Sequence, residues 1–252
     1  MLAKLTFLGC SAPYPGSDDL PAVVVELGKV VVLLDAGEGV QARLFRAGYS
    51  PVRITHILVT HLHGDHVLGL VPLIQSMSLI GREKALQVIG PPGIAHYLKN
   101  SFDSLYFDPP FDINVSEVTP GEVVDLGRGL SVATGEAQHT VPTLYYVIRK
   151  EDRPLIGYVT DTRPLHEGTD SLRGVRVLIH DSAFSANDDV LAQERYHSTS
   201  AEAAGVARSV NAGMLILYHI SARYNERERL LREARRFFEN TYLCSKFMKV
   251  LI

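Results

Sequence analysis

Residues 54–66, ITHILVTHLHGDH, place an apolar run directly before a cluster of three histidines and one aspartate. The run Ile54–Val59 predicts a buried strand. His61 and His63 are two residues apart, so in an extended chain their side chains point to the same side. Gly64 permits a sharp turn, so we expect Asp65 and His66 to project from the start of the apolar helix that follows. Imidazole and carboxylate groups arranged in this way predict a site for two borderline metal ions.

More ligands are needed, because one loop cannot complete two metal shells. His139, Asp161 and His219 each end an apolar or β-rich run, as residues at the edge of a sheet would. Taken singly, each of them has an alternative interpretation as an ordinary turn residue. Together with the loop they make five histidines and two aspartates, which is the inventory for two cations bridged by one carboxylate.

The rest of the chain alternates between strand-like and helix-like segments, which predicts a layered α/β fold. Strands are expected at Leu5–Leu8, Ala22–Leu27, Val30–Leu34, Ile54–Val59, Val175–Ile179 and Met214–Leu217. One helix is expected at Gly39–Ala47, with Val40, Leu44 and Phe45 on one face. A second is expected at Thr199–Val210, with Thr199 and Glu202 as a capping box. A third is expected at Asn225–Phe238, with Asn225 as N-cap and an apolar stripe at Leu230, Leu231, Ala234 and Phe237/Phe238. We expect one domain over residues 1–252, and two similar halves joined near residues 120–130 would fit this length.

Composition narrows the classes of function. The net charge of −3 argues against a broadly basic surface that coats nucleic acid. The two cysteines, Cys10 and Cys244, lie far apart in sequence, and reduced thiols in a cytoplasmic protein are the expectation. No uninterrupted apolar run approaches about 18 residues, so neither a signal peptide nor a membrane-spanning helix is expected.

Six segments together resemble the metallo-β-lactamase superfamily and, within it, the ribonuclease Z (tRNase Z) branch. They are FLGCSAPYPG (7–16), LLDAGEGVQARLFRAGYSPVRITHILVTHLHGDHVLGL (33–70), GYVTDTRP (157–164), LIHDSAF (178–184), YHSTSAEAAGVA (196–207) and YHISARY (218–224). The HxHxDH pattern alone marks only the superfamily. The His-Ser-Thr segment together with HISARY is more specific to this branch.

The resemblance implies a four-layer αββα sandwich, with two β-sheets flanked by helices and the site at one edge. It also implies two Zn²⁺ ions, with Mn²⁺ as the alternative. By this resemblance, His61, His63 and His139 would hold one ion, Asp65, His66 and His219 the second, and Asp161 would bridge them. A hydroxide shared between two such ions is the expected nucleophile on a phosphodiester, and Asp65 is expected to accept its hydrogen bond.

A general acid is implied by the same resemblance. His197 matches the histidine of the His-Ser-Thr motif, which lies beside the scissile phosphate in the family. Asp181 stands where the family usually has the glutamate that orients this histidine, and its side chain is one methylene shorter. Ser198 and Thr199 lie at a helix start, where they could bind a phosphate oxygen or simply cap the helix. Arg223 is a candidate contact to phosphate or to a carboxylate.

A second departure concerns the protruding arm with which the tRNA-binding members grip tRNA. In the longer type this arm is inserted between the third metal-binding histidine and the bridging aspartate, which are His139 and Asp161 here. The 21 residues between them predict a single hairpin, with strands Thr143–Arg149 and Leu155–Thr160 and a turn at Lys150–Pro154. This spacing leaves no room for an arm.

The expected function is therefore that of a di-zinc phosphodiesterase or endoribonuclease of the type that processes tRNA 3′ ends. Its substrate would be RNA, such as pre-tRNA, or a small phosphodiester such as a cyclic nucleotide. Hydrolysis of lactones or β-lactams is a third alternative, and His197 argues against it because those reactions need no acid there. Family analogy adds a homodimer, with no membrane partner, as the expected assembly.

Overall fold

Two seven-stranded sheets lie face to face in the computed structural model of the chain, which describes residues 3–252. The first sheet holds, in spatial order, β16 (Lys249–Leu251), β1 (Lys4–Gly9), β3 (Ala22–Leu27), β4 (Val30–Leu34), β5 (His56–Leu58), β6 (Leu86–Gly90) and β7 (Ile113–Glu117). The second holds β15 (Thr241–Leu243), β13 (Leu215–Tyr218), β12 (Val177–Asp181), β11 (Arg153–Val159), β10 (Thr143–Lys150), β9 (Leu130–Ala137) and β8 (Val123–Gly127). Apart from β16, the change from one sheet to the other falls between Glu117 and Val123, close to the expected junction.

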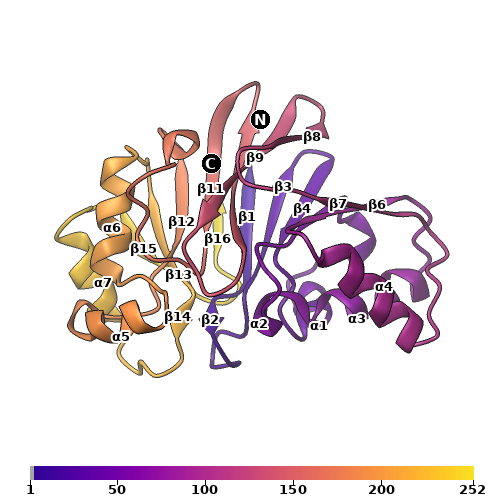
Figure 1. Cartoon of the computed structure of the whole chain (residues 1–252), viewed down its shortest axis with the longest axis horizontal. Helices are drawn as coiled ribbons and strands as arrows, with labels where there is room; N and C mark the ends of the chain where they lie inside the picture. The colour runs from indigo at the N-terminus through magenta and orange to yellow at the C-terminus, as the bar shows by residue number, and fades with distance from the viewer. Residues whose placement is uncertain (1–2) are drawn as a thin grey trace.

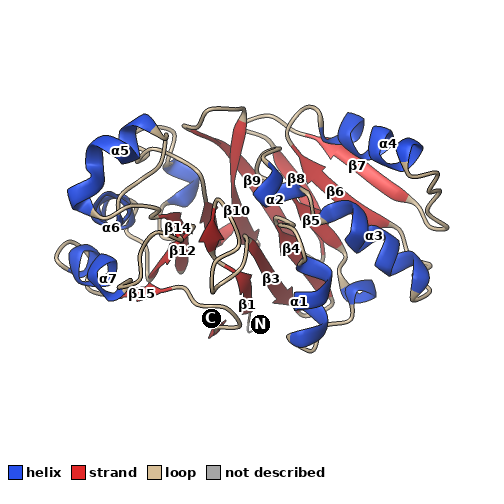
Figure 2. Cartoon of the chain, turned by 90° about the horizontal axis from the view of Figure 1, so that it is seen from below, coloured by secondary structure: helices blue, strands red, loops and turns tan. Residues whose placement is uncertain are grey.

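Helices cover the outer face of each sheet, which completes four layers (Figures 1 and 2). On the first sheet they are α1 (Val40–Arg46), α2 (Gly64–Val67), α3 (Leu70–Leu79) and α4 (Ile94–Ser104), and on the second α5 (Asp189–Glu194), α6 (Ser200–Ser209) and α7 (Glu228–Arg235). Short 3₁₀ turns lie at Pro51–Arg53, Asp170–Leu172 and Ala186–Asp188, and the short strands β2 (Ser11–Ala12) and β14 (Ile220–Ser221) pair in parallel. The predicted αββα sandwich is confirmed.

Both faces of the central strands are buried, which explains their continuous apolar sequences. In β3, Val23 and Val25 pack between the two sheets, while Val24 packs against the helices of the first sheet. In β12, Ile179 lies between the sheets and Leu178 faces the helices of the second sheet. Strands that alternate between two apolar layers need no polar face, so their sequences read as unbroken β-branched runs.

Several expected boundaries and faces are corrected by the structure. β5 is shorter than Ile54–Val59, because the chain enters it through the 3₁₀ turn that ends at Arg53. Phe45 is 53% exposed and does not belong to the buried face of α1. Helix α7 begins at Glu228 after Arg227, so Asn225 is not its N-cap. Two expectations hold: Thr199 and Glu202 form the capping box of α6, and Leu230, Leu231 and Ala234 are buried in α7. The expected continuation of this helix and its apolar stripe to Phe237 is wrong, because α7 ends at Arg235 and Phe237 is 47% exposed.

The hairpin predicted between His139 and Asp161 is present as β10 and β11. Its turn is tighter than expected, because Lys150 pairs with Arg153 and leaves only Glu151 and Asp152 between them, both with positive φ. Two left-handed residues in a row match the twist of the flanking strands. The segment therefore contains no arm. Among residues 3–252, no helix is long and apolar enough to cross a membrane.

Candidate metal centre

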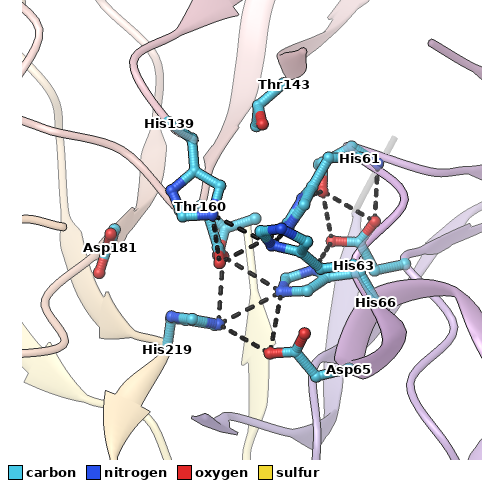
Figure 3. A network of polar contacts seen from close by, with 12 residues as sticks. His61, His63, Asp65, His66, His139, Thr143, Thr160, Asp181 and His219 are labelled. Atoms are coloured by element: carbon cyan, nitrogen blue, oxygen red, sulfur yellow. Dashed lines mark hydrogen bonds and ion pairs between the residues drawn. The ribbon is translucent and has the colours of Figure 1, made fainter. Parts of the chain in front are cut away.

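Seven histidine and aspartate side chains meet at one edge of the two sheets (Figure 3). The loop after β5 supplies four of them from the first sheet, and the other three stand just beyond the ends of β9, β11 and β13 in the second sheet. They are His61, His63, Asp65, His66, His139, Asp161 and His219, which are the seven residues that the sequence predicted to lie together.

The seven side chains form two groups that share Asp161. In the first group, His63 Nδ1 lies 3.1 Å from His61 Nε2 and 3.2 Å from His139 Nε2. Asp161 Oδ2 is 3.6 Å from His61 Nε2 and 3.7 Å from His139 Nε2.

In the second group, Asp161 Oδ1 lies 3.1 Å from both His66 Nε2 and His219 Nε2. Asp65 Oδ2 is 3.6 Å from His66 Nε2 and 3.5 Å from His219 Nε2. Each carboxylate oxygen of Asp161 therefore faces a different group.

The hydrogen bonds made by the Nδ1 atoms of His66 and His139 indicate that the cluster is suited to cations. His66 Nδ1 donates to Asp35 Oδ2 at 2.8 Å, and His139 Nδ1 donates to the carbonyl of Tyr196 at 3.2 Å. In a neutral ring these bonds leave the Nε2 lone pair bare, and both lone pairs point at other nitrogens and at Asp161. Lone pairs gathered this closely in a buried site call for positive charge between them.

Electrostatics around the cluster points the same way. Burial lowers the pKa of His66, but the carboxylates of Asp161 and Asp35 outweigh it and hold that pKa well above its usual range. Burial, followed by the charge of His66, holds the pKa of His61 well below its usual range. Burial raises the pKa of Asp161, but the neighbouring His219, His66 and His61 outweigh it and hold that pKa far below normal. The carboxylates thus create a field that favours cations.

Asp35 supports the cluster from below, and the sequence reasoning did not single it out. Its fully buried carboxylate accepts hydrogen bonds from His66, from Thr60 N at 2.8 Å and from Tyr158 Oη at 2.9 Å. A carboxylate behind a metal-binding histidine fixes the tautomer and the orientation of the ring. The available signal was the position of Asp35 at the end of the apolar run Val30–Leu34, directly before a glycine-containing turn.

The backbone is unusual at three of these positions. Asp35, Asp161 and His219 have φ values of 55°, 51° and 58°, in the left-handed region that non-glycine residues seldom adopt. Asp35 and His219 directly follow the ends of β4 and β13, and one residue separates Asp161 from the end of β11. At each position the turn directs the side chain into the site. Such conformations persist only where the surrounding structure determines them, and they are concentrated at functional sites.

Helix α2 is bound tightly to the loop after β4, which fixes Asp65 and His66. The carbonyl of His66 accepts from Ala36 N, and the carbonyl of Ala36 accepts from Gly69 N, both at 2.8 Å. A Cβ on Gly69 would lie 2.2 Å from the carbonyl oxygen of Gly37, so only glycine fits there. This close approach lets the short helix dock against the loop that carries Asp35.

His197 lies beside the cluster and is held by Asp181. Its Nδ1 donates to Asp181 Oδ2 at 2.8 Å, so the shorter carboxylate does reach the ring. Burial lowers the pKa of His197, but the Asp181 charge and this hydrogen bond outweigh it and raise the pKa to about 9. The ring of His197 stacks on that of His219, with centroids 5.2 Å apart. The dyad therefore places a proton-bearing imidazole next to the seven-residue cluster.

A cavity of about 560 Å³ opens above the cluster and is lined by His63, Asp65, His139, Asp161, His197 and His219. Phe184 and Arg223 form part of its wall, and the Arg223 guanidinium lies 5.0 Å from the centre of the Phe184 ring. Arg223 is thus available to a ligand in the cavity.

Ser198 and Thr199 do not line this cavity. Ser198 Oγ donates to the carbonyl of Thr162 at 2.6 Å, and Thr199 Oγ1 accepts from Glu202 N at 3.2 Å. Both residues are buried. The capping alternative holds for Thr199, whereas the Ser198 hydroxyl is used on the carbonyl of Thr162, so neither hydroxyl faces the cavity.

Comparison with known proteins matches residues 31–220 to the family described as "Beta-lactamase superfamily domain". Ribonuclease Z of Methanothermobacter thermautotrophicus is 33% identical over 99% of this chain and 96% of its own length. That alignment spans 297 residues against the 252 of this chain, so at least 45 aligned positions have no counterpart here.

Two solved structures resemble the fold over nearly its full length. Human tRNase Z, short form, has a TM-score of 0.87 at 25% identity and covers 98% of each chain. The metallo-β-lactamase fold protein YhfI from Bacillus subtilis has a TM-score of 0.86 at 20% identity and covers 100% of each chain. At that identity, the likeness to YhfI speaks for the fold alone.

Proposed function

Because this chain belongs to the β-lactamase superfamily and, within it, to the ribonuclease Z family, we propose that it is a metal-dependent phosphodiesterase that cleaves RNA at the 3′ end of pre-tRNA. The observation that carries this proposal is the His197–Asp181 dyad stacked against a seven-residue His/Asp cluster in one cavity. Hydrolysis of a phosphodiester releases an alkoxide that needs a proton, and a proton-bearing imidazole in the same cavity as the cluster supports this chemistry.

Two divalent ions are part of the proposal, with zinc first and Mn²⁺ as the alternative. His61, His63 and His139 would hold one ion and Asp65, His66 and His219 the other, with one oxygen of Asp161 for each. When bound, these cations supply the Lewis acidity that activates a water molecule and neutralises charge on the phosphate. A donor set of histidine nitrogens and aspartate oxygens suits both Zn²⁺ and Mn²⁺.

The protein's own groups then perform the proton transfers. Asp65 lines the cavity, where its carboxylate would accept a hydrogen bond from the attacking water and orient it. His197 keeps its Nδ1–H on Asp181, so its Nε2–H is the proton offered to the leaving ribose oxygen. Asp181 in turn accepts from Thr162 N and Ala183 N at 2.9 Å, which fixes the carboxylate. Arg223 would bind a phosphate oxygen, and Phe184 would hold its guanidinium in place.

Cleavage of small phosphodiesters is the second candidate, because the segment between His139 and Asp161 contains no arm. The hairpin between β10 and β11 turns over two residues, and the aligned ribonuclease Z has at least 45 positions more. Two arginines near the start of α7 are already paired, Arg227 with Asp18 and Arg229 with Glu233. Two further points remain predictions. One is a homodimer, which would add a basic surface, and the other is a cytoplasmic location.

The test is to assay the purified, metal-loaded protein on pre-tRNA, a cyclic nucleotide and a lactone side by side, with Asp161→Ala as the inactive control. We expect pre-tRNA to be cut at its 3′ end and the lactone to remain intact. Cleavage of the cyclic nucleotide alone would favour the second candidate. Hydrolysis of the lactone alone would contradict both.

A further inference from the structure

Arg163 joins the metal cluster to the histidine dyad, although neither the motifs nor the proposed chemistry gives it a role. It stands two residues after Asp161, and its side chain is only 17% exposed. Its Nη1 donates to the carbonyl oxygen of His197 at 2.5 Å, and its Nη2 donates to Glu202 Oε1 at 2.7 Å. A guanidinium is therefore fixed between the backbone of the dyad and a carboxylate.

Glu202 is a firm anchor for this guanidinium. It is the third residue of α6, and its Oε2 accepts from Thr199 N at 2.8 Å as part of the capping box. The carboxylate cannot move without breaking the start of the helix. Arg163 thus ties the carbonyl of His197 to a rigid helix end rather than to a mobile surface group.

The tied segment carries two functional groups. It is the short connection between α5 and α6, in which the carbonyl of Tyr196 accepts from His139 Nδ1 and the ring of His197 reaches Asp181. Tyr196 has a φ of 57°, so the backbone there is held in a strained form. Any shift of this segment would move His197 relative to Asp161.

The other end of the link is equally well fixed. Arg163 N donates to the carbonyl of Gln138 at 3.0 Å, and Thr162 Oγ1 accepts from Gln138 N at 2.9 Å. Gln138 directly precedes His139, and Thr162 directly follows Asp161. Arg163 therefore reaches to His197 from the turn that presents Asp161, and this turn is hydrogen-bonded to the one that presents His139.

We propose that Arg163 is a positioning residue that sets the place of the His197 ring relative to the metal centre. This inference rests on the proposed function, because it requires His197 to be the general acid. The planar fork of arginine holds a carbonyl and a carboxylate at once, which the single ammonium of lysine cannot do in the same geometry. A displacement of about 1 Å at a reacting group can cost about 10²-fold in rate.

The experiment compares Arg163→Met in the wild type and in His197→Ala, with the metal-loaded full chain. One substrate is an RNA with a ribose leaving group, and the other is a p-nitrophenyl phosphodiester, which scarcely needs a proton. Arg163→Met should lower kcat on RNA by about 10–100-fold, with KM changed less than about twofold, and should barely affect the nitrophenyl substrate. In the His197→Ala background the same change should cost nothing further, because its target is gone.

Arg82→Met is the matched control. Arg82 is buried and, like Arg163, donates to backbone carbonyls, here those of Ile54, Lys84 and Ala85, but these lie at the opposite ends of β5 and β6 from the site. It should reduce thermal stability without separating the two substrates. If Arg163→Met fails to fold, Arg163→Lys carries the same test, with a partial loss on RNA expected.

An equal loss on both substrates for Arg163→Met, or an undiminished loss in the His197→Ala background, would overturn the inference and leave Arg163 as a structural residue. A selective loss on RNA in His197→Ala without one in Arg163→Met would overturn the inference alone. If His197→Ala itself lost both substrates equally, the acid role would fall, and the inference with it.

Discussion

The two sheets supply the site in different ways. The first sheet contributes four cluster residues within six positions, on one loop and one short helix, with Asp35 directly beneath them. The second contributes His139, Asp161 and His219 one at a time, from turns after three different strands, together with the dyad. One half of the site is therefore built by local chain geometry, and the other by the alignment of strands distant in sequence.

In the second sheet, strand register brings the site residues together, whereas in the first sheet the HLHGDH loop does so. β11, β12 and β13 are parallel, with Val159 opposite His180 and Asp181 opposite Tyr218. This register brings Asp161, Asp181 and His219 to the same edge. A slip of one residue would turn each side chain to the opposite face. The second half of the site thus depends on the whole sheet, whereas the first half depends on one turn.

The largest effect is expected at Asp161, where the two halves meet. Asp161→Ala should remove both cations and lower activity by more than about 10³-fold, because each of its oxygens faces one group. Asp65→Ala should weaken only the second group. Elemental analysis after dialysis measures both. Full metal content and full activity in Asp161→Ala would show that the assignment of the groups is wrong.

The next effect tests the dyad, which belongs to the second sheet alone. His197→Ala should keep both cations and lose about 10²–10⁴-fold in rate on RNA. The loss should be smaller on a p-nitrophenyl phosphodiester, because nitrophenolate leaves without a proton. An equal loss on both would indicate that His197 positions the phosphate, and no loss on either would leave it a structural residue.

A smaller effect tests the support within the first sheet. Asp35→Asn should weaken binding of one cation by about 10–100-fold, because the amide no longer accepts as strongly from His66 Nδ1. Binding of the ion of the first group should weaken less, because His61 is linked to Asp35 through the hydroxyl of Thr60 rather than directly. Metal titration of the stripped protein measures this, with the exposed Asp170→Asn as control. Equal weakening of both ions would mean that Asp35 supports the fold rather than His66.

The smallest difference is expected between RNA substrates, because the segment between His139 and Asp161 contains no arm. Pre-tRNA and an unstructured RNA with the same 3′ sequence should differ by less than about tenfold in kcat/KM, which is about 1.4 kcal/mol. Binding of both should weaken strongly between about 50 and 200 mM salt, as phosphate contacts do. A preference of several hundred-fold for pre-tRNA would reveal a tRNA-reading surface elsewhere on the protein.

The difference between the halves also explains what the sequence could predict. The strands and the HLHGDH cluster were predictable from local pattern alone, since both depend on neighbouring residues. Asp181 and His197 could be paired only through the resemblance, because their contact depends on where α5 and α6 rest on the second sheet. Arg163 and Tyr196 were missed, since their contacts run through backbone carbonyls, which leave no mark in the residue pattern.

Errors at element ends have a similar cause. Phe45 and Asn225 satisfy a helical pattern and a capping preference, but tertiary contacts decide which residues are covered and where a helix starts. Arg227 precedes α7 and pairs with Asp18, a contact that lies outside any local helix signal. Such contacts join residues more than 200 positions apart and cannot be read from a window of sequence.

The most direct test of a two-cation centre built from both sheets is anomalous diffraction at the zinc edge from crystals of the zinc-loaded protein. The account predicts two peaks about 3.5–4 Å apart, one among His61, His63 and His139 and one among Asp65, His66 and His219, with Asp161 between them. A single peak, or two peaks that Asp161 does not join, would contradict it.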